Sequence, residues 1–213
     1  MLDLATLQAG AFELAERDRD LARVHQLHGP PPLWSRPPGF ATLVRIILEQ
    51  QVSLASARGT FGRLKQKLGG RISSKGVLQL EGEGLRELGF SRQKARYAVS
   101  LAQQVAARQF SIAQLQRLSD EAARQRLTSL LGFGNWSADV YLMMALRRPD
   151  VLPTGDLGLI KGIEEVCQRS FEDALAITEY AQRWRPLRSI ATRMIWQAYL
   201  VRRGQDPHSI SDG

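Results

Sequence analysis

Cysteine is almost missing from this chain, with Cys167 alone among 213 residues. A single thiol excludes an internal disulfide framework and any four-cysteine zinc or iron–sulfur site. Apolar runs long enough to cross a bilayer are also missing. The first twenty residues are acidic and amphipathic, without the basic start and apolar block of a signal peptide. We therefore expect a reduced, cytoplasmic compartment, no membrane, no metal and no cofactor.

Lysine is scarce too, while arginine is abundant. The chain has 5 lysines and 24 arginines, a net charge of +8 and a sequence pI of about 10.2. The guanidinium group presents a planar fork of donors that suits phosphate. A basic domain of this kind favours a polyanionic partner, and nucleic acid is the first candidate. The alternative is a solvated, arginine-rich surface with no such partner.

No stretch shows a series of β alternations, and apolar residues recur at helical spacing almost throughout. The pattern predicts an all-α protein of about ten short helices, with residues 2–27 on one helical face. Ser53, Ser91, Ser111 and Ser119 are expected N-caps, and the last helix is expected to begin at Pro186. The two longer loops, 28–38 and 147–155, predict two lobes with a cleft between them. One lobe combines 1–38 with 149–213, and the other spans 39–148.

The segment "LLGFGNWSADV" (130–140) places Gly132 and Gly134 on either side of Phe133, between two amphipathic helices. Glycine is used where the backbone takes a positive φ or approaches another group closely. Small residues here would let backbone N–H groups at the start of the second helix bind a phosphate oxygen. This pattern is a helix–hairpin–helix, and such contacts carry no base sequence information. An ordinary tight turn between packed helices explains the same residues.

Asp156 follows "VLPTG" and opens the apolar segment "LGLIKGI". Aspartate is a favoured N-cap, so a purely structural role is open. Hydrogen bonds from helix N–H groups also favour the charged form of a carboxylate. An ionised carboxylate beside a pocket can stabilise a cationic transition state and orient water. Cleavage of a sugar–base bond passes through an oxocarbenium-like state of that kind.

Five segments together resemble the helix–hairpin–helix DNA glycosylases, in the branch of 3-methyladenine DNA glycosylase II. They are "FATLVRIILEQQVSLASA", "LGFSRQKARYAVSLAQQV", "LTSLLGFGNWSADVYLMMAL", "RPDVLPTGDLGL" and "WRPLRSIATRMIWQAYL". They follow the family's order and span nearly all of residues 10–203. The resemblance implies the glycosylase fold and base excision, in which a damaged nucleotide is flipped out of duplex DNA and its glycosidic bond is hydrolysed.

The resemblance also implies roles for particular residues. Asp156 would stabilise the sugar cation and assist the attacking water, and Gln51 would be the wedge that enters the emptied base stack. The base pocket would be lined by Trp136, Trp196 and Tyr141. The DNA backbone would be held by Gly132, Phe133, Gly134, Asn135, Ser137 and Lys94. Each has a plainer alternative, since helical tryptophans usually belong to the core and charged side chains to a solvated face.

The departures from the family pattern are informative. Bifunctional relatives carry a nucleophilic lysine where this chain has Trp136, so we expect hydrolysis without strand cleavage. Val140 stands where some relatives have a pocket tyrosine, and Glu49 replaces a glycine common before the two glutamines. The iron–sulfur loop of other relatives is absent.

The expected substrate is therefore double-stranded DNA that contains an alkylated purine such as 3-methyladenine or 7-methylguanine, bound by a monomer. Such bases are cationic, and an indole face attracts a flat cation. Two alternatives stay open: a non-catalytic helix–hairpin–helix module that binds DNA, and a glycosylase for another lesion such as 8-oxoguanine.

Overall fold

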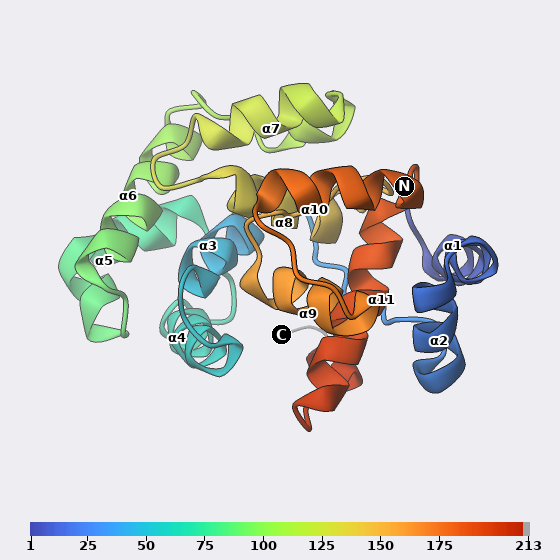
Figure 1. Ribbon diagram of the computed structural model, residues 1–213. Coiled ribbons are helices and arrows are strands. Elements are labelled where there is room, and N and C mark those ends of the chain that lie inside the picture. The colour runs from blue at the N-terminus through green and yellow to red at the C-terminus, as the bar shows by residue number, and fades with distance from the viewer. Residues whose placement is uncertain (211–213) are drawn as a thin grey trace. The chain divides into compact units, whose positions relative to one another are not determined.

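The computed structural model describes residues 1–210, and every regular element among them is a helix. Figure 1 shows their course along the chain. The expected all-α class is confirmed for the described residues. Positions 211–213, part of the expected terminal lobe, lie outside the described residues.

The chain divides into two compact units. The terminal unit comprises Met1–Ser35 and the described residues from Leu142 onward, and the central unit is Arg36–Tyr141. The terminal unit contains α1 (Leu4–Arg17), α2 (Arg19–His28), α9 (Leu157–Cys167), α10 (Ala174–Tyr180), α11 (Arg188–Arg202) and the 3₁₀ turns η2 (Ala181–Trp184) and η3 (Pro207–Ile210). The central unit contains α3 (Phe40–Glu49), α4 (Leu54–Lys67), α5 (Ser74–Glu87), α6 (Arg92–Ala106), η1 (Ala113–Arg117) and α7 (Asp120–Thr128). Helix α8 (Asn135–Met144) begins in the central unit and ends in the terminal one.

The single helical face expected over residues 2–27 is wrong in one respect, because the chain breaks at Asp18 between α1 and α2. The Asp18 carboxylate accepts hydrogen bonds from the backbone N–H groups of Asp20 and Leu21, and so caps α2. Its second oxygen accepts the indole N–H of Trp184 at 2.8 Å. Trp184 is fully buried, so this bond satisfies the one polar atom of its ring.

Helix α11 is the centre of the terminal unit and contacts α1, α2 and α9 (Figure 1). Two glycines set how closely its neighbours approach. A Cβ at Gly162 of α9 would lie 2.6 Å from Cγ2 of Ile195, and a Cβ at Gly10 of α1 would overlap Ile190. Because neither position has a side chain, both helices pack directly on α11.

The helix boundaries agree with most of the expected caps. Ser53, Ser91 and Ser119 each accept a backbone N–H in the first turn of α4, α6 and α7. Ser111 is not a cap, since the N-cap of η1 is Ile112. The start expected at Pro186 is also wrong. Helix α11 begins at Arg188, whose N–H is accepted by the Asp150 carboxylate.

The central unit carries an ion cluster at the end of α3. Arg36 donates two hydrogen bonds to the two oxygens of Glu49, at 2.7 and 2.8 Å, and Nε of Arg45 donates a third at 3.2 Å. All three side chains are at most 10% exposed. Glu49 is thus a structural residue of this unit, which explains the acidic side chain at a position where the family commonly has glycine.

Candidate active site and DNA-binding turn

Asp156 is the N-cap of α9, as the sequence predicts. Its Oδ1 accepts the backbone N–H of Leu159 at 2.7 Å, and its backbone is extended. The side chain is half-buried. A carboxylate at this place also lies at the positive end of the helix dipole.

Trp196 of α11 lies beside this carboxylate. Its indole Nε1–H donates to Oδ1 of Asp156 at 3.2 Å, so the same oxygen receives two donors. The sequence predicts both residues as site residues, and the structure brings them together. The close packing of α9 on α11 at Gly162 makes this approach possible.

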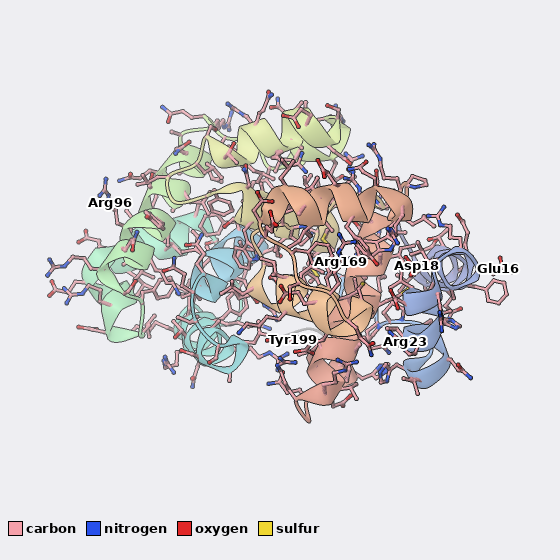
Figure 2. All side chains as sticks on the ribbon, viewed as in Figure 1. Glu16, Asp18, Arg23, Arg96, Arg169 and Tyr199 are labelled. Carbon is pink, nitrogen blue, oxygen red and sulfur yellow. The ribbon has the colours of Figure 1, made fainter. Side chains whose placement is uncertain are left out.

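Gly158 lies between the same carboxylate and the ring of Tyr199, and neither residue was expected. A Cβ at Gly158 would lie 3.2 Å from Oδ1 of Asp156 and 3.5 Å from Cε1 of Tyr199. Figure 2 labels Tyr199 on α11. The Arg203 guanidinium stacks on its ring at 3.5 Å from the centroid. No local sequence pattern indicates the contact of Gly158 with Tyr199, because it depends on the packing of α9 against α11.

In the turn 132–137 of the central unit, the two glycines have different roles. Gly132 has a φ of 83°, and a Cβ there would overlap the ring of Tyr97. Gly134 has no atom within 4 Å of a Cβ and no positive φ. The fold therefore requires Gly132, whereas nothing within the fold requires glycine at 134.

Gly134 begins the hydrogen bonding of α8, because its carbonyl accepts the N–H of Ala138 at 3.1 Å. Phe133 is 5% exposed and anchors the turn in the core. The first N–H groups of an α-helix are not used by the helix's own hydrogen bonds. Gly134 stands directly before this helix end, is exposed and has open space where a side chain would be.

Gln50 fixes the geometry of this turn. Its Nε2 donates to the carbonyl of Gly132 at 2.8 Å and to Oγ of Ser137 at 3.0 Å. The Ser137 side chain is 2% exposed, so it supports the turn from inside. The partners of Gln50 lie more than 80 residues away along the chain, and no sequence signal could have identified this role.

The next residue, Gln51, lies in the connection between α3 and α4. It is exposed and has a φ of 55°. A non-glycine residue rarely adopts this left-handed conformation. Lys94 of α6 lies near the same connection, where its Nζ donates to the carbonyl of Leu48 at 2.7 Å. Burial lowers the pKa of this ammonium. In this structure Lys94 therefore stabilises the carboxyl end of α3.

The other two expected pocket residues belong to α8. Trp136 is half-buried in the first turn of the helix, while Tyr141 is fully buried in the central unit. Burial raises the pKa of the Tyr141 phenol.

Residues 1–210 contain no helix of the length and apolarity that a membrane span requires. Over the same residues, no three His, Cys, Asp or Glu side chains are grouped in a way that would hold a metal ion.

An all-α chain with a glycine turn before one helix and a half-buried aspartate before another is typical of the helix–hairpin–helix proteins. The family model of the HhH-GPD superfamily base excision DNA repair proteins matches residues 44–188. The chain belongs to this superfamily.

Several relatives and solved structures are similar to this chain. The Bacillus subtilis protein YfjP, provisionally named a DNA-3-methyladenine glycosylase, is 25% identical over 84% of this chain and 65% of its own length. The structure of a Schizosaccharomyces pombe 3-methyladenine DNA glycosylase in complex with abasic DNA has a TM-score of 0.79 at 24% identity, over 89% of this chain and 95% of that one. A DNA-3-methyladenine glycosidase from Bacillus halodurans has a TM-score of 0.77 at 26% identity, over 93% and 92%. The chain thus spans just under two thirds of the length of YfjP.

Proposed function

We propose that this protein is a DNA glycosylase that flips alkylated purines out of duplex DNA and hydrolyses their N-glycosidic bond. The observation that carries the proposal is the Asp156 carboxylate, held at a helix N-terminus by Leu159 N–H and the Trp196 indole in a chain of the HhH-GPD superfamily. The names of the relatives, which are 3-methyladenine glycosylases, support the choice of substrate.

Asp156 acts on the sugar. As the base leaves, positive charge develops on the deoxyribose ring, and a carboxylate with a fixed orientation stabilises that charge. The same group orients the water that attacks C1′. An alkylated purine carries a positive charge and departs as a neutral base, so the reaction needs little acid catalysis.

The turn 132–137 holds one DNA strand. The first-turn N–H groups of α8 bind a phosphate, and the absence of a side chain at Gly134 lets the backbone approach the strand. Asn135 and Ser137 contribute backbone donors to this contact, with Phe133 as the anchor. Gln51 is the wedge, since it is exposed at the tip of the α3–α4 connection.

Trp196, which lies beside Asp156, stacks against the flipped base, because the face of an electron-rich indole attracts a flat cation. Trp136 as a second pocket residue stays a prediction. Tyr141 as a pocket residue and Lys94 as a backbone contact stay predictions. The structure gives Tyr141 a core position and Lys94 a bond to Leu48.

The proposed reaction is hydrolysis without strand cleavage. An amine nucleophile would form a Schiff base with C1′, and Trp136 occupies the position that carries this amine in bifunctional relatives. Borohydride reduction during turnover should therefore trap no covalent adduct between the protein and DNA.

The decisive experiment is base release from a panel of single-lesion duplexes. Wild-type protein should release 3-methyladenine and 7-methylguanine, and Asp156→Asn should lower the rate about a hundredfold because the charge stabilisation is lost. Asp173→Asn is the matched control. Asp173 caps α10 through Ala176 N–H in the same unit, so this variant should keep the wild-type rate.

Other outcomes would identify the alternatives. Salt-sensitive DNA binding without release of any base would indicate a non-catalytic binding module. Release of 8-oxoguanine with the alkylated purines intact would indicate a glycosylase for a different lesion. Equal rates for wild type and Asp156→Asn would contradict the role of the carboxylate.

A further inference from the structure

The proline-rich segment between α2 and α3 contains a buried tryptophan. Trp34 is 6% exposed and has a φ of 45°. A bulky residue rarely adopts a positive φ, and it does so only where the surrounding structure determines its conformation. One such constraint is the hydrogen bond from the Trp34 indole Nε1–H to the carbonyl of Pro207, at 2.9 Å.

Helix α11 holds the same segment through two further side chains. The fully buried Arg193 donates from Nε to the carbonyl of Leu33 at 2.9 Å, and from its other nitrogens to the carbonyls of Ser189 and Met143. Gln197, one turn later, donates to the carbonyl of His28 at 3.1 Å. Segment 28–34 is thus attached to α11 on both sides of the position of Trp196.

Trp34 packs against Trp196 itself. The two ring centroids are 6.2 Å apart and the ring planes are inclined at 61°, which is an edge-to-face contact. Trp196 in turn donates its indole N–H to Oδ1 of Asp156. At 3.2 Å this hydrogen bond is long, and Trp196 is only half-buried, so packing must help to keep the ring in place.

We propose that Trp34 is a positioning residue: it keeps the Trp196 ring in the orientation that donates to Asp156. The inference rests on the proposed function, in which Asp156 acts on the sugar. Groups behind a reacting residue often decide whether it keeps a productive geometry. Trp34 and Trp196 both lie outside residues 44–188, the range that the family model matches, so family membership alone does not assign this pair.

The test compares substitutions at Trp34 with one at Trp184. Trp34→Leu removes the ring, while Trp34→Phe keeps an aromatic ring and loses only the bond to Pro207. Trp184→Phe is the matched control, because Trp184 is a fully buried tryptophan of the same unit whose indole bonds to Asp18 and whose ring packs on Tyr180. All variants are compared at temperatures below their melting transitions.

We expect Trp34→Leu to lower the single-turnover rate of alkylated-base release about tenfold or more, because small misplacements of a reacting group have effects of that order. Its Kd for duplex DNA containing an abasic site should stay within about twofold of wild type, because the substitution changes the rate of the chemical step and not the binding of DNA. Trp34→Phe should recover part of the rate. Trp184→Phe should lower the melting temperature and leave the rate of the folded protein unchanged.

Two further measurements separate positioning from a general structural role. In an Asp156→Asn background, Trp34→Leu should cause no additional loss of rate, because the carboxylate that accepts the Trp196 indole N–H has been removed. Indole proton exchange, measured by NMR on a protein with four tryptophans, should become faster for Trp196 in Trp34→Phe. This NMR measurement does not depend on activity. It uses Trp34→Phe, which keeps an aromatic ring at position 34.

A wild-type rate in Trp34→Leu would overturn the inference, and so would an equal loss of rate in the Asp156→Asn background or unchanged Trp196 exchange. If these results occur while wild type releases alkylated bases and Asp156→Asn releases them much more slowly, only the role of Trp34 is wrong. If wild type releases no base, or Asp156→Asn is as active as wild type, the proposed function fails, and the role of Trp34 fails with it.

Discussion

The carboxylate of Glu49 lies inside the central unit between two arginines. It receives two hydrogen bonds from Arg36 and one from Arg45, and burial together with the neighbouring Arg36 charge lowers the pKa of Arg45. A buried charge that loses its partner is strongly unfavourable, because water does not replace the lost interaction. The stability of this unit therefore depends on Glu49, which in the sequence alone is only a departure from the family pattern.

Glu49→Gln should lower the free energy of unfolding by about 3 kcal/mol, since the buried guanidinium groups of Arg36 and Arg45 would lose the charge of Glu49. Urea denaturation measures this loss. Glu13→Gln is the control, because the Glu13–Arg17 pair of α1 is largely exposed. Its effect should stay below about 1 kcal/mol. Similar values for the two variants would contradict the stabilising role of the buried cluster.

Single residues of the site differ in how well the sequence identifies them. Asp156 could be predicted because its partner Leu159 is three residues away and N-caps have a local signature. The roles of Gln50 and Trp34 could not be predicted, because their hydrogen-bond partners lie 82 or more residues away. A local sequence pattern does not indicate such distant contacts. Trp196 was predicted through family resemblance alone.

At the scale of secondary structure, the turn before α8 has one glycine that the fold requires and one that it does not. Gly132 combines a φ of 83° with the contact of Tyr97, whereas Gly134 faces open space. We therefore expect the two glycines to respond differently to the same substitution.

Gly132→Ala should destabilise the protein by about 1–3 kcal/mol, because the added methyl group both strains the backbone and overlaps the Tyr97 ring. Gly134→Ala should leave the melting temperature unchanged within about 2 °C. It should also weaken binding to abasic-site DNA about tenfold, since the methyl group stands between the first-turn amides and the phosphate. Thermal unfolding and fluorescence anisotropy measure the two effects. Unimpaired DNA binding by Gly134→Ala would argue against the proposed phosphate contact.

Helix positions were largely predictable, and their exceptions have physical causes. Serine caps mark α4, α6 and α7 because a side-chain oxygen satisfies a first-turn N–H locally. The break at Asp18 and the late start of α11 were missed. The start of α11 depends on a partner distant in the sequence, because the Asp150 carboxylate accepts the N–H of Arg188. The Asp18 cap is local, through the N–H groups of Asp20 and Leu21, but the apolar pattern continues across it.

For the molecule as a whole, the loop that leads into Val151 is attached to the start of α11 by Asp150. Arg188 donates to both oxygens of this carboxylate, and Arg185 donates to one. Burial alone would raise the pKa of the Asp150 carboxyl, but the hydrogen bonds and charge of Arg188 outweigh it and hold the pKa below its usual range. Such a group stabilises the folded chain above its unfolded pKa, near 3.9, and loses this effect as the pH falls through its folded pKa.

Asp150→Asn should therefore be less stable than wild type at pH 7, and its stability should fall less steeply between about pH 5 and pH 2. Chemical denaturation at a series of pH values checks this, with Asp206→Asn, a substitution near the carboxyl terminus, as the comparison. Parallel pH curves for wild type and Asp150→Asn would show that the Asp150–Arg188 pair does not contribute to acid sensitivity.

The amide of Gln50 joins the carbonyl of Gly132 and the hydroxyl of Ser137 to the chain segment that ends at Gln51. Within the central unit, the tip at residue 51 and the turn therefore keep a constant spacing. A duplex gripped at the turn would meet that tip at the same offset at every position along the strand. At each position the side chain at residue 51 would then probe one base step in the same way. A base step that is weakened by damage would open most readily, before the base itself is bound.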